Sequence, residues 1–381
     1  MAALRGSRIV FVLAGEVFGG AERGALDLAE IVRDEGASVA VLALDDRPGR
    51  GRDVAASREI GWSSLPVSWT GGRVGKARSL LEVSRALRAL RPDAIVANTN
   101  MPNVVCGLTW RVTGARTAVW RQCDVNGSTR FSTGLYRRGL HATPVVVAGA
   151  EHARTWLASG YGIDPARIEV IPSQVRLPSA REGRAAWRAR LGVADGAFVA
   201  CMLAHLDAGK DHATLLRAWR LVVSKLDGAR PTLLVVGRDA GTAAASKALA
   251  FDLDLGDSVR FLGEVDDVAG ALDASDAAVF CSHRELLPRG VTEPMVAALP
   301  VVATELPGTR EALGSPEPWV LVPPDDPAAL AASVLRLAGD AALRRRLGEE
   351  NRAVARERER RSSPDRAWTR LLVRALESGR V

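Results

Sequence analysis

The sequence predicts an α/β protein with two doubly wound domains, and three observations carry this prediction. The chain has 381 residues, more than a single hydrophobic core usually organises. Short apolar runs alternate with amphipathic helical segments over almost the whole length, which is typical of parallel sheets buried on both faces. The alternation pauses once, at residues 172–184, where prolines and small polar residues gather in "PSQVRLPSAREG". We therefore expect a domain boundary in this segment.

The first half of the chain opens with a strand, a helix and a second strand. "RIVFVLAG" at residues 8–15 and "SVAVLALDD" at residues 38–46 are strand-like, and residues 21–36 between them have the apolar spacing of an amphipathic helix. Because parallel strands need such a crossover, this unit predicts a parallel sheet. Three further strand-like runs lie at residues 93–98, 117–122 and 144–149.

The second half repeats this pattern. Residues 198–206 and 231–239 predict strands, and residues 211–226 predict the amphipathic helix that joins them. The chain closes with a predicted amphipathic helix at residues 364–379. Four more strand-like runs lie at residues 258–265, 276–282, 299–304 and 319–324.

Charge and cysteine usage limit the function classes. The net charge of +7 is spread over many arginines, which is compatible with acidic small molecules, an anionic membrane or an arginine-rich composition alone. No RNA-recognition signature or aromatic–basic patch occurs, so we expect no nucleic-acid partner. The four cysteines form no CxxC pair, which disfavours a zinc ribbon or a disulfide framework and favours the cytoplasm.

The N-terminal apolar run "IVFVLA" is only six residues long. Its length favours a first buried strand over a signal peptide. No apolar stretch reaches the length of a membrane span, so we expect a soluble or at most peripheral protein.

Ligands of doubly wound folds bind where strands end and loops enter helices. After the first strand, Gly19 and Gly20 precede a helix, so their amides can face a phosphate, or they can simply allow close packing. The acidic end of "LALDD" also fits a ribose in a dinucleotide fold, but the GxGxxG spacing is missing.

The first strand of the second half leads into "LAHLDAGKDHATLL", in which His205 lies at the strand end and Lys210 just before the helix. A lysine there can neutralise a diphosphate, and His205 can donate a hydrogen bond to the same group. Lys210 taken alone is more typical of an exposed lysine at a helix start.

"SHRELLPRGVTEP" carries Glu285 and Glu293, eight residues apart. Thr292 resembles an N-cap and Pro294 is best tolerated in a first turn, so we expect a helix that begins near Thr292 with Glu293 facing the end of the strand. Each glutamate alone is also explained as a solvated or dipole-stabilising residue.

Taken together, these segments resemble the retaining GT-B glycosyltransferases of family 4. The resemblance rests on the glycine pair after the first strand, on "LAHLDAGKDHATLLRAWRLV", and on the two glutamates followed by "LPVVAT" and a Pro-Gly turn. "RFLGEVDDVAGALDASDAAVFCS" and "ARIEVIPSQVRLP" are similar to further family segments. The resemblance implies a GT-B fold, with two Rossmann-like domains facing a central cleft. The implied parts are an acceptor domain at 1–176, a donor domain at 177–360, and a helix at 361–381 that packs back on the first domain.

The resemblance also implies roles. Glu293 would bind the nucleotide ribose, Glu285 the transferred sugar, and Lys210 the leaving diphosphate, with His205 beside it. The other implied donor-binding residues are Gly19, Gly20, Arg289, Thr292, Gly237 and Gly263. The implied acceptor residues are Glu22, Asn98, Asn100 and Arg121. The nucleotide-sugar is a substrate whose base (UDP, GDP or another) stays open, and neither a cofactor nor a metal is implied, since these loops carry no DxD-like pair.

Some positions depart from the family pattern. His205 stands where the family usually has arginine, and Leu286 and Ala298 stand at two usual glycines. The histidine that commonly contacts the sugar is missing from "VWRQCDV". We therefore expect a donor pocket tighter than the family norm and an altered acceptor side.

The predicted function is retaining transfer of a sugar from a nucleotide-sugar to a hydroxyl of a glycan, lipid-linked or small-molecule acceptor. Two alternatives stay open: a degenerate GT-B protein that binds a nucleotide-sugar or a partner, and a nucleotide-sugar epimerase. The basic strips at 71–90 and 130–140 suggest peripheral docking on the inner face of a membrane, or a merely solvated helix face. The oligomeric state is left open.

Overall fold

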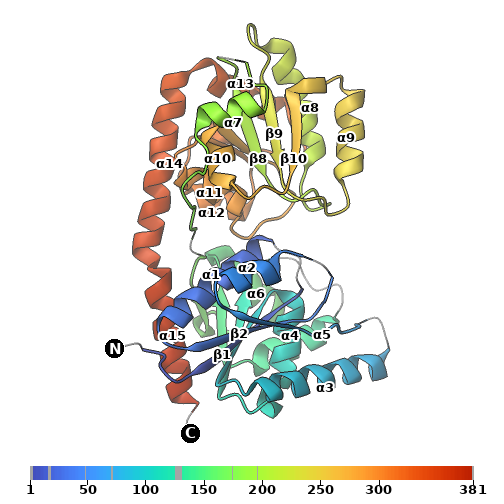
Figure 1. The fold of residues 1–381 in the computed structure, drawn as a ribbon, viewed down its shortest axis with the longest axis vertical. Helices are drawn as coiled ribbons and strands as arrows, with labels where there is room; N and C mark the ends of the chain where they lie inside the picture. Colours follow the sequence, from blue (N-terminus) through green and yellow to red (C-terminus); the bar gives the residue numbers. More distant parts are fainter. Residues whose placement is uncertain are drawn as a thin grey trace. The chain divides into compact units, whose positions relative to one another are not determined.

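The computed structural model describes residues 3–15, 19–47, 49–69, 72–124, 131–173, 175–194 and 196–379. The chain forms two compact units (Figure 1). Unit 1 comprises Met1–Gln174 together with Ser362–Val381, and unit 2 comprises Val175–Arg361.

Unit 1 is built on a parallel sheet of seven strands in the order β3-β2-β1-β4-β5-β6-β7. The order reverses between β1 and β4, which makes this the topological switch point of the sheet. The strands are β1 (Arg8–Leu13), β2 (Ser38–Ala43), β3 (Gly61–Ser64), β4 (Ala94–Asn98), β5 (Thr117–Gln122), β6 (Val145–Ala148) and β7 (Ile168–Val170). The helices are α1 (Gly20–Asp34), α2 (Gly51–Ser57), α3 (Arg73–Leu90), α4 (Asn100–Thr109), α5 (Thr133–Ala142), α6 (Glu151–Tyr161) and α15 (Pro364–Ser378).

The C-terminal helix α15 belongs to the core of unit 1. Trp368, Leu371, Leu372 and Leu376 are all buried there, at a spacing that places them on one helix face. Burying each such side chain contributes about 1.5–3 kcal/mol. The C-terminal helix is therefore packed on the same unit as the N-terminal strand β1.

Unit 2 has a parallel sheet of six strands in the order β10-β9-β8-β11-β12-β13, with its switch point between β8 and β11. The strands are β8 (Val199–Leu203), β9 (Thr232–Val236), β10 (Val259–Gly263), β11 (Ala277–Phe280), β12 (Val301–Thr304) and β13 (Leu321–Val322). The helices are α7 (Arg184–Arg190), α8 (His212–Lys225), α9 (Ala243–Asp252), α10 (Val268–Asp273), α11 (Arg289–Val296), α12 (Pro307–Leu313), α13 (Pro327–Gly339) and α14 (Ala341–Ser362). The predicted α/β class with two doubly wound sheets is confirmed.

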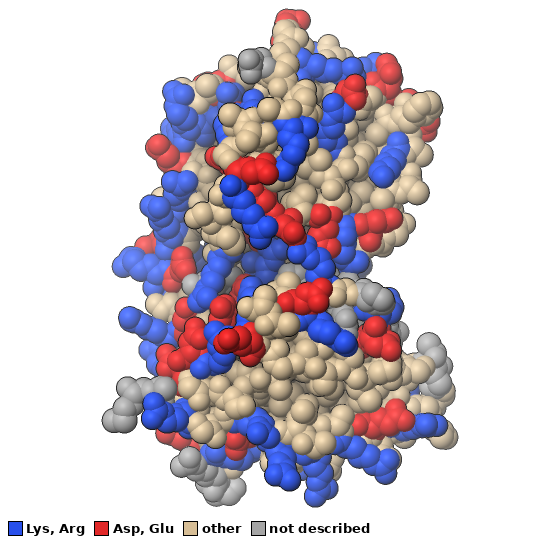
Figure 2. Space-filling model, viewed as in Figure 1, with Lys and Arg blue, Asp and Glu red and all other residues tan. Residues whose placement is uncertain are grey.

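The basic excess has no single location on the face shown in Figure 2, where Lys and Arg side chains are interspersed with Asp and Glu. Among the described residues, no helix combines the length and apolarity that a membrane crossing requires.

Candidate functional site

The loops that follow β8 and β11 lie against each other at the carboxyl edge of the unit 2 sheet. Asp211 N donates to Cys281 O over 3.1 Å, and His283 N donates to Gly209 O over 3.0 Å. Lys210 and Ser282 form an isolated antiparallel bridge between the two loops. The switch point therefore carries one continuous hydrogen-bonded surface, where ligands of doubly wound sheets bind.

Lys210 and Glu285 form an ion pair on this surface. Ser282 Oγ lies 2.8 Å from Glu285 Oε1, so a neutral donor also holds the carboxylate. The Lys210 ammonium lies 5.6 Å from the centre of the Phe280 ring. The Lys210 side chain is 21% exposed and that of Glu285 is 11%, so water screens this charge pair less than a surface pair. The structure thus brings together two residues that the sequence assigns to one reaction centre.

Glu293 and Arg289 pair on helix α11. Arg289 Nε lies 2.9 Å from Glu293 Oε1, and the Glu293 side chain is only 6% exposed. Both residues project from one helix face, since they stand four positions apart.

The predicted start of this helix near Thr292 is wrong. Helix α11 begins at Arg289 after Pro288, and Pro294 lies inside it. The carbonyl of Pro288 accepts from the amides of both Val291 and Thr292 at 3.0 Å, which starts the helix one turn earlier. Thr292 is buried within the helix, and its hydroxyl bonds back to the Pro288 carbonyl at 3.2 Å instead of capping an end. The helix tolerates Pro294 at the loss of one backbone hydrogen bond.

Two glycines hold the site loops close to the helices, one in the Pro-Arg-Gly step between the two glutamates and one in the Pro-Gly turn. A Cβ at Gly290 would lie 2.2 Å from Leu203 O, at the end of β8. A Cβ at Gly308 would lie 2.3 Å from Leu286 O and 2.6 Å from Glu285 O. Both values are far below van der Waals contact, so α11 and α12 pack directly on the backbone that carries the site.

His205 follows β8 in a half-buried stretch. Gly237, with φ +157°, lies so near that a Cβ there would meet Ala204 O at 1.8 Å. Gly237 N in turn donates to Gly263 O over 2.8 Å. The structure therefore places the predicted glycines at the ends of β9 and β10, next to the His205 segment.

In unit 1, Gly19 is the N-cap of α1, and its amide donates to Glu22 Oε2 over 3.1 Å. Glu22 thus caps its own helix, as a first-turn acid commonly does. Residues 16–18 of the predicted phosphate loop lie outside the described residues.

Arg121 lies inside unit 1 and is only 4% exposed. Its Nη1 donates to Asn98 Oδ1 over 2.7 Å, and its Nη2 donates to Ser173 Oγ over 2.9 Å. The guanidinium also lies 5.9 Å from the Trp368 ring of α15. Arg121 and Asn98 therefore bind each other and the last residues before the second unit. Cys123 lies beside them, and burial raises the pKa of its thiol to about 11.

Asn100 belongs to a second polar group at the same edge. Its Nδ2 donates to Asp124 Oδ1 over 2.7 Å, and its Oδ1 accepts from Gln122 Nε2 and from the Tyr136 hydroxyl, each over 3.1 Å. Burial raises the pKa of Tyr136, so its hydroxyl stays protonated. The preceding Thr99 has φ +71°, a strained value for a β-branched residue. Such strain is typical of functional positions, and here it coincides with the unit 1 switch point.

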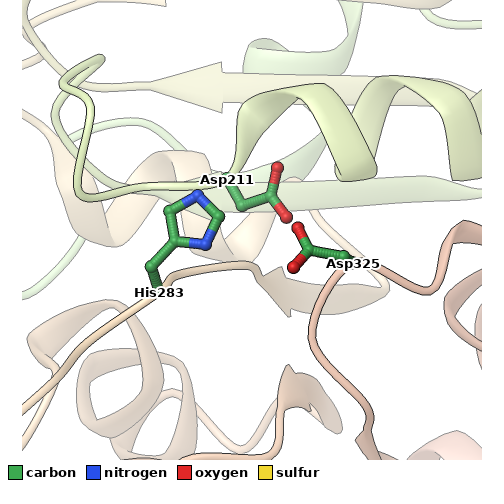
Figure 3. Close-up of side chains that lie close together, drawn as sticks. All are labelled: Asp211, His283 and Asp325. Atoms are coloured by element: carbon green, nitrogen blue, oxygen red, sulfur yellow. The ribbon is translucent and has the colours of Figure 1, made fainter.

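A further group of metal-ligand type lies in unit 2, and the sequence reasoning did not detect it. Asp211, His283 and Asp325 each offer one donor atom, and these atoms all lie within 4.8 Å of one another (Figure 3). The three residues are far apart in sequence and follow β8, β11 and β13.

Chemically, the unit 2 site combines a fixed ammonium with two carboxylates of low exposure. Carboxylates accept hydrogen bonds from sugar hydroxyls, and a held cation stabilises a departing phosphate. The unit 1 groups are mostly amides and hydroxyls, which hydrogen-bond neutral polyols.

Two protein-family models together match most of the chain. Residues 18–177 match the model of Glycosyltransferase Family 4, and residues 183–354 match that of Glycosyl transferases group 1. Lys210, Glu285 and Glu293 of unit 2 and Glu22 of unit 1 all fall inside these matches.

Similar proteins carry related names. The chain is 34% identical to a D-inositol 3-phosphate glycosyltransferase of Geodermatophilus obscurus over 51% of this chain and 45% of the relative. It is 27% identical to a phosphatidyl-myo-inositol mannosyltransferase of Mycobacterium leprae over 87% of each chain. The chain spans about half the length of the inositol 3-phosphate relatives that it matches.

Among solved structures, Anabaena HepE in complex with UDP and glucose superposes with a TM-score of 0.78 at 22% identity, covering 92% of this chain and 95% of that one. At this identity the likeness concerns the fold. The two sheets, their switch points and both family matches agree: the chain belongs to the glycosyltransferases of family 4 and group 1, with the GT-B fold.

Proposed function

We propose that this chain moves a sugar from a nucleotide-sugar donor to an acceptor hydroxyl and retains the anomeric configuration. The observation that carries the proposal is the Lys210–Glu285 pair at the switch point of unit 2, in which Glu285 lies in the loop that leads into the helix carrying the buried Glu293. Glycosyl transfer develops negative charge on the departing diphosphate and positive charge on the sugar, so a preorganised cation and carboxylate match its transition state.

In this proposal the donor is contacted by helix α11 and by the loops that follow β8 and β11. Glu293 accepts hydrogen bonds from the ribose, and Arg289 orients it through their 2.9 Å pair. Lys210 contacts the leaving diphosphate, and Glu285 contacts the sugar beside its anomeric carbon. Lys210 and Glu285 form an ion pair with each other in this structure. A bound donor must therefore compete with this pair for the ammonium and for the carboxylate. His205, Gly237, Gly263 and Thr292 complete the donor side in unit 2, and the Gly19–Gly20 start of α1 is the proposed phosphate contact of unit 1.

The acceptor side is assigned to unit 1. We infer a sugar, lipid-linked or small-molecule acceptor, because most of the groups at that switch point are amides and hydroxyls, which hydrogen-bond neutral hydroxyls. The inositol-containing acceptors in the names of the relatives agree with this class. Asn100 and Glu22 are the proposed contacts, and Arg121 with Asn98 supports them from within the core.

Three finer points belong to the same proposal. No divalent cation bridges the diphosphate, since Lys210 supplies its countercharge. No cofactor takes part in the reaction. The protein works in the cytoplasm, with peripheral contact to anionic lipid through helix α3, whose sequence carries five Lys and Arg residues, Arg73, Lys76, Arg78, Arg85 and Arg88.

A thermal-shift screen with UDP-, GDP-, ADP- and dTDP-sugars tests donor binding. A ligand that binds only the native state at 100-fold its Kd should raise the melting temperature by roughly 5–10 °C. Glu293→Gln should abolish this shift. Glu350→Gln should keep it, because Glu350 pairs with Arg346 on the surface of α14. If no nucleotide-sugar shifts the parent chain, or if Glu293→Gln binds as the parent does, the donor assignment is overturned.

A further inference from the structure

Asp211, His283 and Asp325 come from three separate loops at the carboxyl edge of the unit 2 sheet. Figure 3 shows their side chains turned toward a common point. Within the part of the chain that the structure describes, this is the one group of three or more His, Cys, Asp or Glu side chains close enough for a shared metal ion.

Two of the three positions are fixed independently of any ion. The Asp211 amide donates to Cys281 O, and the His283 amide donates to Gly209 O, so each loop anchors the other. Asp211 is 7% exposed, and its Oδ1 accepts from Thr214 N over 2.9 Å. This capping bond orients the carboxylate and leaves its remaining lone pairs for a cation.

Charge also favours a cation at this point. The carboxylates of Asp211 and Asp325 lie within 4.8 Å of each other, so their negative charges repel. Among the described residues, neither forms an ion pair with Lys or Arg, and the neighbouring Lys210 is paired with Glu285. A bound cation would offset the repulsion.

We propose that Asp211, His283 and Asp325 bind one Zn²⁺ ion, with water as its fourth ligand. One imidazole nitrogen and two carboxylate oxygens are a donor set that suits zinc better than magnesium or calcium, which take all-oxygen sites. Zinc bonds are about 2.0–2.2 Å long, so the three donor atoms must move closer to one another when the ion binds. His283 and Asp325 are exposed, so their side chains have room to rotate.

The ion would join the loops on which the reaction centre depends. Asp211 directly follows Lys210, and His283 lies two residues before Glu285. Zinc would thus act as a clip between the β8 and β11 loops, apart from the donor diphosphate. This inference does not rest on the proposed function, since the site consists of residues without an assigned role in transfer.

The test uses the untagged full chain, stripped with EDTA, dialysed and titrated with ZnCl₂ alone. We expect about one zinc per chain by elemental analysis, and a melting temperature raised by roughly 5–10 °C at 100-fold excess over Kd. Co²⁺ in place of zinc should give visible d–d absorption typical of four-coordinate nitrogen and oxygen ligation.

His283→Ala and Asp325→Asn should both lose the zinc shift while keeping the zinc-free melting temperature, because both side chains are exposed. Asp227→Asn, an exposed aspartate of the same unit, should keep the full shift. Absence of a zinc shift in the parent chain, or an equal shift in the two site variants, overturns the proposal. A shift of the same size with MgCl₂ would overturn the assignment to zinc.

Discussion

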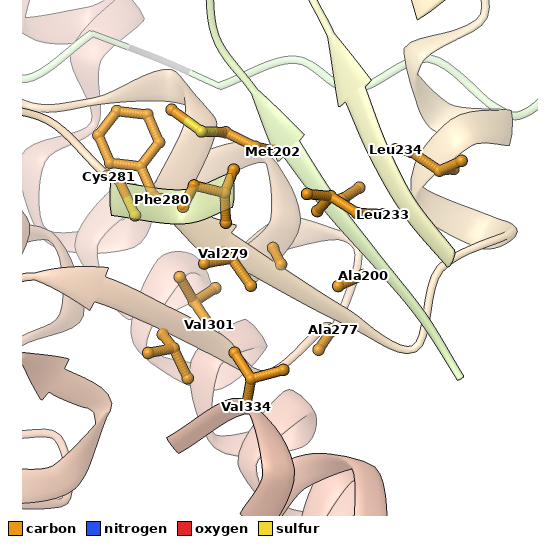
Figure 4. Close-up of a cluster of buried hydrophobic side chains, with 14 of the residues drawn as sticks. Ala200, Met202, Leu233, Leu234, Ala277, Val279, Phe280, Cys281, Val301 and Val334 are labelled. Carbon is orange, nitrogen blue, oxygen red and sulfur yellow. The ribbon is translucent and has the colours of Figure 1, made fainter. Parts of the chain in front are cut away.

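Gly290→Ala should damage both stability and turnover, although alanine is the better helix former. The alanine Cβ would lie 2.2 Å from Leu203 O and 2.6 Å from Phe280 Cε2. Ordinary contact begins at 3.4 Å, so the helix must move away from the strand by about 3.4 − 2.2 = 1.2 Å. Phe280 is part of the packed core shown in Figure 4 and has little freedom to yield.

The magnitude follows from two opposing effects. Overpacking of this kind lowers the free energy of unfolding by up to about 3 kcal/mol, and the higher helix propensity of alanine raises it by about 1 kcal/mol. We expect the free energy of unfolding to fall by about 2 kcal/mol and the melting temperature by roughly 4–8 °C. A displacement of about 1 Å at α11, which carries Glu293, should lower turnover about 100-fold.

Urea denaturation followed by far-UV circular dichroism measures the stability change, and donor turnover measures the second effect. Gly160→Ala is the matched control, because Gly160 lies in helix α6 and a Cβ there would have no neighbouring atom within 4 Å. It should stabilise the chain by up to about 1 kcal/mol. If Gly290→Ala is as stable as Gly160→Ala, α11 does not pack on the β8 backbone as described.

Three further predictions concern single side chains. Lys210→Met should lower kcat for donor turnover by about 10²–10³ with a small change in KM, and an unchanged kcat would remove Lys210 from the leaving-group site. Ala298 has φ +59°, so Ala298→Gly should relieve backbone strain and raise the free energy of unfolding by about 0.5–1 kcal/mol. Ala297, at φ −73°, is unstrained, so Ala297→Gly should lower the free energy of unfolding. Equal effects of the two substitutions in urea denaturation would contradict strain at Ala298. Burial lowers the pKa of His212 below its ordinary 6.5, so the unfolded chain takes up the proton first as the pH falls. The free energy of unfolding should therefore decrease as the pH falls below about 6.5, by at most about 1.4 kcal/mol per pH unit. His212→Leu should make the free energy of unfolding less dependent on pH in this range. An unchanged pH dependence in His212→Leu would exclude His212 as its source.

Most of the fold could be predicted from the sequence, because strands buried on both faces read as continuous apolar runs. "AIVAN" in β4 is buried throughout, and so is "TLLVV" in β9. The edge strand β3 (Gly61–Ser64) escaped prediction, since it is short and only partly buried. The other edge strand, β7 (Ile168–Val170), lies in "ARIEVIPSQVRLP", the segment that resembles the family's interdomain strand. The start of α11 was misplaced because Pro294 resembles a first-turn proline, although tertiary packing holds it inside the helix.

The sequence predicted which residues of the site lie at strand ends, but not which of their side chains contact each other. The contact between Lys210 and Glu285 depends on the pairing of β8 with β11, which joins residues 75 positions apart. The cluster of Asp211, His283 and Asp325 depends on three loops in the same way. The burial of Arg121 depends on Gly24 in α1, where a Cβ would lie 3.2 Å from its Nη2. Such contacts follow from strand order, which local sequence patterns do not encode.

The stereochemistry of turnover tests the central claim most directly. An α-configured nucleotide-sugar that stabilises the chain should be followed by proton NMR during its slow hydrolysis, in the parent and in Lys210→Met. Retaining transfer predicts release of the nucleoside diphosphate together with sugar that appears first in the α configuration, and much slower release in the variant. Sugar that appears first in the β configuration, or binding without any turnover, would contradict retaining glycosyl transfer at the Lys210–Glu285 site.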